Sequence, residues 1–113
     1  MTTHNFELNL LTILVACTPN EILLRYGAIG FYLLEYKTVS KEEILKVLNA
    51  YVPNERKYFN NIRETISKMS IEEQELLYSA VESLVAINSR HYETPGERNI
   101  VKFKLAKIFN KKI

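Results

Sequence analysis

Four positions along this chain carry the same helix-start signal, in which a Ser or Thr is followed three residues later by Glu. The four pairs are Thr18/Glu21, Ser40/Glu43, Ser70/Glu73 and Thr94/Glu97. In such a capping box the hydroxyl accepts a hydrogen bond from the third backbone amide, and the Glu carboxylate accepts one from the amide of the cap residue. At Pro19 and Pro95 a proline also occupies the first helical position, where its missing N–H costs nothing. Each signal leads into an apolar, periodic segment, so the sequence predicts helices that begin near residues 19, 41, 71 and 95.

Apolar periodicity predicts the remaining elements and the fold class. The expected helices cover about 4–16, 19–37, 41–51, 54–68 and 71–90, with a last segment that begins at residue 95. All 13 acidic residues are Glu, which tolerates helix interiors better than Asp does. We therefore expect an all-α protein, a compact bundle of five or six helices, with residues 1–113 forming a single domain.

Two of these helices have features that predict their place in the bundle. The wide apolar stripe of the first helix indicates a central position. The second is apolar nearly all round and contains Gly27 and Gly30, which predict a kink, a break or a close helix crossing.

The C-terminal segment has two interpretations. Residues 99–105 alternate between apolar and polar, as a half-exposed strand would. As a helix, the segment separates an apolar face from a lysine stripe, with Val101, Leu105, Ile108 and Phe109 on the first and Lys104, Lys107 and Lys111 on the second. The capping signal before Pro95 favours the helix, and the strand is kept as the alternative.

The sequence contains no motif that predicts catalysis. Cys17 ends an apolar helix, where a free cysteine usually behaves as a small buried hydrophobe, and His4 falls in a terminus expected to fray. The Glu clusters lie in first turns of helices, where the helix dipole already favours negative charge. Phosphate-binding glycine loops, metal-binding spacings and nucleophile motifs are absent from the sequence. We expect a protein that is not an enzyme and that takes no cofactor and no metal.

The apolar runs are shorter than the ~20 residues that cross a bilayer, and the first residues lack the basic stretch of a signal peptide. The single cysteine cannot form an internal disulfide. These features predict a soluble, cytoplasmic protein that has no contact with a membrane.

The distribution of basic residues indicates two surfaces for a nucleic acid or an acidic partner. Residues 41–68 resemble two helices with a tight link, as in a helix-turn-helix, and the outer face of the second would present Arg56, Lys57, Asn60 and Arg63. Arg and Asn are suited to guanine and adenine edges. The second surface is the basic C-terminal helix at 98–112, with Lys104, Lys107 and Lys111. A solvated helix end whose lysines complement the helix dipole explains that stripe equally well.

Seven tyrosines and no tryptophan make the chain rich in one residue type that is common at protein interfaces. Four of them fall outside the apolar stripes, namely Tyr26, Tyr36, Tyr78 and Tyr92. They predict either packing at helix edges or a protein interface. The leading hypothesis is a small non-catalytic accessory protein that binds another protein, a second copy of the chain included. The alternative is a nucleic-acid-binding domain.

Overall fold

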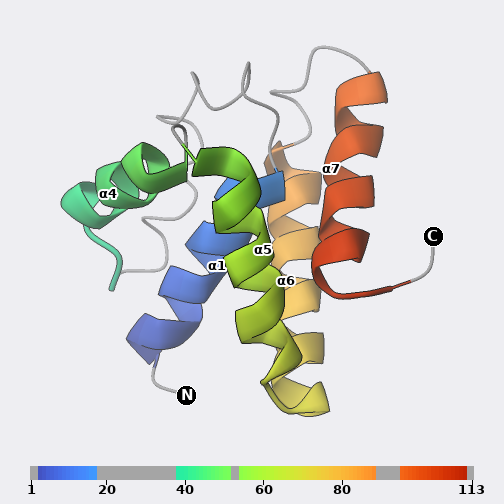
Figure 1. The fold of residues 1–113 in the computed structure, drawn as a ribbon, viewed down its shortest axis with the longest axis horizontal. Coiled ribbons are helices and arrows are strands. Elements are labelled where there is room, and N and C mark those ends of the chain that lie inside the picture. The colour runs from blue at the N-terminus through green and yellow to red at the C-terminus, as the bar shows by residue number, and fades with distance from the viewer. Residues whose placement is uncertain (1–2, 18–37, 52–53, 89–94, 112–113) are drawn as a thin grey trace.

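The computed structural model describes residues 3–17, 38–51, 54–88 and 95–111, and these ranges form five α-helices without a strand. The helices are α1 (Thr3–Cys17), α4 (Lys41–Tyr51), α5 (Glu55–Ser67), α6 (Ile71–Asn88) and α7 (Pro95–Ile108). They pack as a compact helical bundle (Figure 1), which confirms the predicted all-α fold. The helix expected at 19–37, with Gly27 and Gly30, lies outside the described residues.

Helix α1 is the centre of the bundle, as its wide apolar stripe predicts. It packs against α4, α5, α6 and α7, and in Figure 1 it passes behind α5. From Leu10 to Cys17 every side chain except that of Thr12 is buried. Each fully buried Leu or Ile contributes about 1.5–3 kcal/mol, so this one helix provides much of the apolar core.

The capping boxes at Ser40 and Ser70 set the starts of α4 and α6. The Ser40 hydroxyl accepts from the Glu43 amide at 3.2 Å, and the Glu43 carboxylate accepts from the Ser40 amide at 3.2 Å, which closes the complete box. The Ser70 hydroxyl likewise accepts from the Glu73 amide at 3.2 Å. The predicted starts at 41 and 71 are therefore confirmed. Thr18 and Thr94, the caps of the other two boxes, lie outside the described residues.

Helix α6 buries Leu77, Val81, Leu84 and Val85. The sequence also predicts Leu76 on this face, and that prediction is wrong because its side chain is 63% exposed. Successive helical residues are about 100° apart. A stripe that is centred on Leu77 and Val81 therefore leaves Leu76 beyond its edge.

The C-terminal segment is the helix α7, and the strand alternative for residues 99–105 is wrong. Val101, Leu105 and Ile108 are all buried, at the i, i+4 and i+7 spacing of one helical face, which α7 packs against α1. A strand would instead have buried Phe103 together with Val101 and Leu105, whereas Phe103 is 54% exposed. Helix α7 contacts α5, and the two run side by side in the same direction in Figure 1.

Candidate functional site

A groove of about 810 Å³ lies between α5 and α7, and it brings together residues from the two basic surfaces predicted separately. Its lining residues are Glu55, Arg56, Phe59, Asn60 and Arg63 from α5, and Asn99, Ile100, Phe103, Lys104 and Lys107 from α7. Five of the seven predicted contact residues, Arg56, Asn60, Arg63, Lys104 and Lys107, are thus neighbours in space although they are up to half the chain apart in sequence.

Helical spacing explains why each helix presents these residues on one side. On α5, Arg56, Asn60 and Arg63 follow one another at i, i+4 and i+7, so they form one row along the helix. On α7, Ile100, Phe103 and Lys107 have the corresponding i, i+3 and i+7 spacing. The two rows border the groove because α7 turns its other face, with Val101 and Leu105, into the core.

Three apolar side chains, Phe59, Ile100 and Phe103, form what we call the apolar floor of the groove. Phe59 is half-buried and packs against the core, whereas Ile100 and Phe103 are 47% and 54% exposed. Single exposed apolar residues are ordinary, but adjacent ones within a concave surface are typical of interaction sites. The apolar floor therefore marks the groove as more than a solvated charged surface.

The groove also carries a positive charge, from Arg56, Arg63, Lys104 and Lys107, which we call the basic rim. Among the lining residues that the structure describes, Glu55 is the only acidic one, so four cations against one carboxylate give them a formal charge of +3. Glu55 lies 3.4 Å from the Lys104 ammonium and partly neutralises it. Within the described ranges, the structure shows no ion pair for Arg56, Arg63 or Lys107, so three cations of the rim are available to an anionic group.

Two of the predicted basic residues, Lys57 and Lys111, are not among the lining residues of this groove. Lys57 borders a neighbouring depression with Asn54 and Asn61 instead. The ammonium of Lys111 lies 3.0 Å from the Glu75 carboxylate and 4.4 Å from the centre of the Tyr78 ring. Lys111 thus contacts α6, and it does not continue the row that Lys104 and Lys107 begin.

Of the four predicted interface tyrosines, the structure describes Tyr78. It is half-buried, and its ring meets that of Phe109 edge-to-face at a centroid distance of 5.3 Å and an angle of 84°. These contacts agree with packing at a helix edge. Tyr26, Tyr36 and Tyr92 lie outside the described residues.

Sequence reasoning missed the apolar floor, although a signal for it exists. If residues 95–108 are taken as a helix, Ile100 and Phe103 fall outside the face that Val101, Leu105 and Ile108 define. Apolar residues that miss the buried face of their own helix are candidates for a second contact surface. What the sequence does not show is that Phe59 of α5 lines the same groove.

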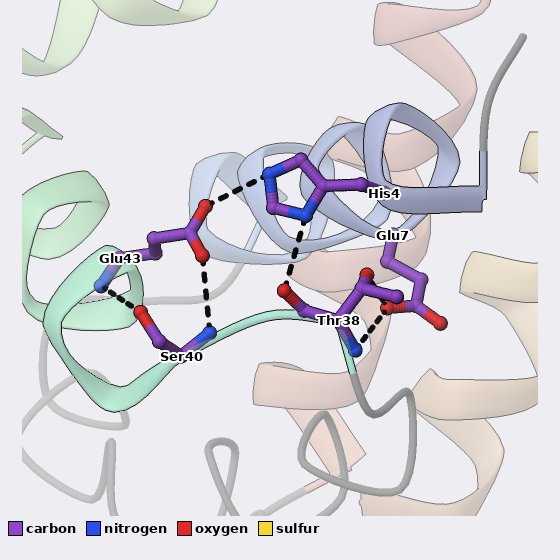
Figure 2. Close-up of polar contacts among 5 residues, drawn as sticks. All are labelled: His4, Glu7, Thr38, Ser40 and Glu43. Carbon is purple, nitrogen blue, oxygen red and sulfur yellow. Dashed lines mark hydrogen bonds and ion pairs between the residues drawn. The ribbon is translucent and has the colours of Figure 1, made fainter.

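A second polar cluster joins α1 to the start of α4 (Figure 2). His4 Nδ1 lies 3.0 Å from the Thr38 carbonyl oxygen, and His4 Nε2 lies 3.1 Å from the Glu43 carboxylate. Glu7, which is buried, accepts hydrogen bonds from the amide of Thr38, at 2.9 Å, and from its hydroxyl. The expectation of a frayed terminus at His4 is therefore wrong. These groups satisfy one another, which is the pattern of a structural clamp.

Cys17 is buried, and its thiol donates to the Leu14 carbonyl oxygen at 3.5 Å. Burial raises the pKa of this thiol to about 12, so the nucleophilic thiolate is strongly disfavoured. Among the described residues, the structure shows no group of three or more His, Cys or Glu side chains that could hold a metal ion.

The arrangement between α5 and α7 is suited to binding. It combines a concave shape, an exposed apolar floor and a basic rim, and Cys17 lies in the core rather than among its lining residues. No helix in the described ranges is long and apolar enough to span a bilayer. Comparisons of the chain with models of protein families, with curated proteins and with solved structures give no match.

Proposed function

We propose that this protein is a non-catalytic accessory protein whose groove between α5 and α7 binds a segment of another protein. One observation carries the proposal. Two of the four large apolar side chains that the structure describes as exposed, Ile100 and Phe103, lie in the same groove as three cations without an ion pair in the described ranges. Protein interfaces combine an apolar centre with a polar rim, and aromatic residues and Arg are enriched in them.

The composition of the groove favours a protein over a nucleic acid. Interfaces with DNA are more polar and much more positive than those with proteins. The described lining residues of the groove have a formal charge of only +3, and the apolar floor includes Ile100, an aliphatic side chain on which a base cannot stack. A phosphate backbone bound to the basic rim would make no apolar contact with Ile100 and Phe103, so their side chains would stay exposed to water.

The geometry of α5 also weakens the helix-turn-helix alternative. A recognition helix enters the major groove of DNA, which is about 12 Å wide and admits a single helix. Arg56, Asn60 and Arg63 face the groove that α7 borders, so the face that would read bases lies in a concavity. Because α7 lies beside it, α5 cannot present the row of Arg56, Asn60 and Arg63 to base edges as an isolated protruding helix can.

The single cysteine bears on where in the cell the protein acts. We propose that the protein acts in the cytoplasm, because its one cysteine, Cys17, is a free thiol that is buried in the hydrophobic core at the end of α1. Disulfides form and persist in extracellular proteins, and a single cysteine cannot form one within the chain.

A site-specific crosslinking experiment tests the proposal. A photoreactive phenylalanine analogue placed at Phe103 should crosslink to protein in the native host, and the crosslinks should survive nuclease treatment. The matched control is the same analogue at Leu76, which is similarly exposed but lies on α6 outside the groove. Crosslinks that disappear with nuclease, or that form equally well from position 76, would contradict the proposal.

A further inference from the structure

We infer that the occupant of the groove is an acidic amphipathic α-helix of the partner protein. Its apolar side chains would lie on the apolar floor, and its carboxylates would meet the basic rim. This inference rests on the proposed function, because it specifies the chemistry of the protein segment that the groove binds.

The length of the groove fits a short helical segment. Its lining extends from Asn99 to Lys107 on α7, eight residue steps, which is about 12 Å at 1.5 Å per residue. On α5 it extends from Glu55 to Arg63, which is again about 12 Å. A helix that lies in the groove would therefore contact it over about two turns, enough for three or four apolar residues at i, i+3, i+4 and i+7.

The apolar floor sets the first requirement on this segment. Ile100 and Phe103 are one turn apart on α7 and half-exposed, and Phe59 of α5 lines the same groove. Apolar residues at helical spacing on the partner segment would cover both Ile100 and Phe103. Anchors of this kind are the residues that dominate binding energy in helix-in-groove complexes.

The basic rim sets the second requirement. Arg56 and Arg63 lie on the α5 side and Lys107 on the α7 side, so positive charge borders the floor from both helices. A bound helix with carboxylates on both flanks of its apolar face would match this pattern. Arg can bind a carboxylate through two parallel hydrogen bonds, which also fixes its orientation.

The groove favours a helix over an extended segment for a reason of hydrogen bonding. Extended peptides usually bind by adding a strand to the edge of a sheet, where main-chain groups of the two chains pair. The described part of this protein is helical and offers no sheet edge. A helix satisfies its own backbone groups, so contacts between side chains are sufficient to hold it.

A designed peptide tests the inference directly. The probe is a fluorescent peptide of about 16 residues, ~24 Å long as a helix, with Leu at i, i+3, i+4 and i+7 and Glu on both flanks. Its counterpart has every Glu replaced by Lys. With the full 113-residue chain at ~150 mM salt, we expect the acidic probe to bind at least about tenfold more tightly, a difference of 1.4 kcal/mol. Its helix content should also rise on binding.

Variants with matched controls locate the contact. Phe103→Ala should weaken the acidic probe by about tenfold or more, as truncation of a hot-spot residue does. Leu76→Ala removes a similarly exposed apolar side chain outside the groove and should change nothing. Lys107→Glu should weaken binding at least as much, whereas Lys57→Glu, the same charge change on a residue outside this groove, should have little effect.

Several outcomes would overturn the inference. They are equal affinity for the acidic and basic probes, equal losses in the control variants, displacement of the probe by a single-stranded oligonucleotide, and self-association in analytical ultracentrifugation that Phe103→Ala abolishes. Protein crosslinks from position 103 together with no binding of the acidic probe would reject the acidic helix and leave the proposed function standing. Absence of both would reject the two together.

Discussion

The ammonium nitrogen of Lys104 lies 3.4 Å from the carboxylate of Glu55, so an ion pair links α7 to the first turn of α5 across one side of the groove. Both side chains are partly exposed, and exposed pairs of this kind contribute only about 0–1 kcal/mol to stability. Glu55 also lowers the positive charge of the groove, because it is the one carboxylate among the described lining residues, which include four cations.

Replacement of Glu55 by Gln should strengthen the binding of an acidic helical peptide. The change removes one negative charge and releases Lys104 for the peptide, so we expect an affinity gain of about threefold, most evident at low salt. Glu64→Gln is the control, because Glu64 lies on the same helix but pairs with Lys68 outside the groove. Titrations at two salt concentrations give the comparison, and an equal gain from both variants would mean that only the overall charge matters.

The local structure of this protein could be predicted from its sequence because it depends on local interactions. Capping residues and periodic apolar side chains act within one or two turns, so the starts at 41, 71 and 95 are confirmed. The helix predicted at 54–68 is observed at Glu55–Ser67, and α1 extends one residue beyond its predicted range at each end.

The groove could be predicted only in part, because it depends on which helices become neighbours. The basic rows on α5 and α7 are visible in the sequence, since each has helical spacing. Their meeting across one groove is a property of tertiary packing around α1. The same reason explains the error at His4, whose partners Thr38 and Glu43 are more than 30 residues away in sequence.

The cap of α6 allows a test on a single helix. Ser70→Ala removes the hydroxyl that accepts from the Glu73 amide and should lower the free energy of unfolding by about 1 kcal/mol. Ser83→Ala, in the exposed middle of the same helix, removes only a bond to the Ser79 carbonyl oxygen, and it should be neutral or slightly stabilising because Ala is the better helix former. Urea denaturation measures both, and equal effects would show that the cap does not stabilise the helix.

The Glu43 carboxylate should make stability depend on pH in the acid range. The hydrogen bond from the Ser40 amide, with a smaller contribution from His4, lowers its pKa below the ordinary 4.5. A lowered folded pKa gives stability that is complete above the unfolded value and is lost as the pH falls through the folded one. The thermal midpoint of the wild type should therefore exceed that of Glu43→Gln at neutral pH, and the gap should narrow below pH 4.5. A gap that stays constant down to about pH 2 would contradict this.

Tyr51, which is buried, and Tyr58, which is half-buried, are in edge-to-face contact and should respond differently to loss of their hydroxyl groups. Tyr51 donates to the Ala16 carbonyl oxygen at 3.4 Å, whereas the buried hydroxyl of Tyr58 has no hydrogen-bond partner among the described residues. Tyr51→Phe should cost about 0.5–1.5 kcal/mol, since it removes the hydrogen bond to the Ala16 carbonyl oxygen. Tyr58→Phe removes an unsatisfied polar group and keeps the ring, so it should be neutral or stabilising by up to about 1 kcal/mol. Equilibrium unfolding gives the free energy of unfolding of both variants. A loss of stability in Tyr58→Phe would indicate that the Tyr58 hydroxyl has a hydrogen-bond partner.

The dependence of affinity on salt separates protein binding from nucleic-acid binding. Phosphate contacts release counterions, so a protein that uses the basic rim on duplex DNA would lose affinity steeply with salt, with a slope of about 0.9 for each contact. Combined Lys104→Ala and Lys107→Ala would then flatten that slope by up to about 2, whereas Lys111→Ala would change it little because Lys111 is paired with Glu75. We expect no such behaviour. Binding to mixed DNA or RNA at ~150 mM salt should be undetectable below ~100 μM, weaker than most non-specific DNA binders. Fluorescence anisotropy gives the answer, and micromolar binding with that salt dependence would replace the protein-binding proposal by the nucleic-acid one.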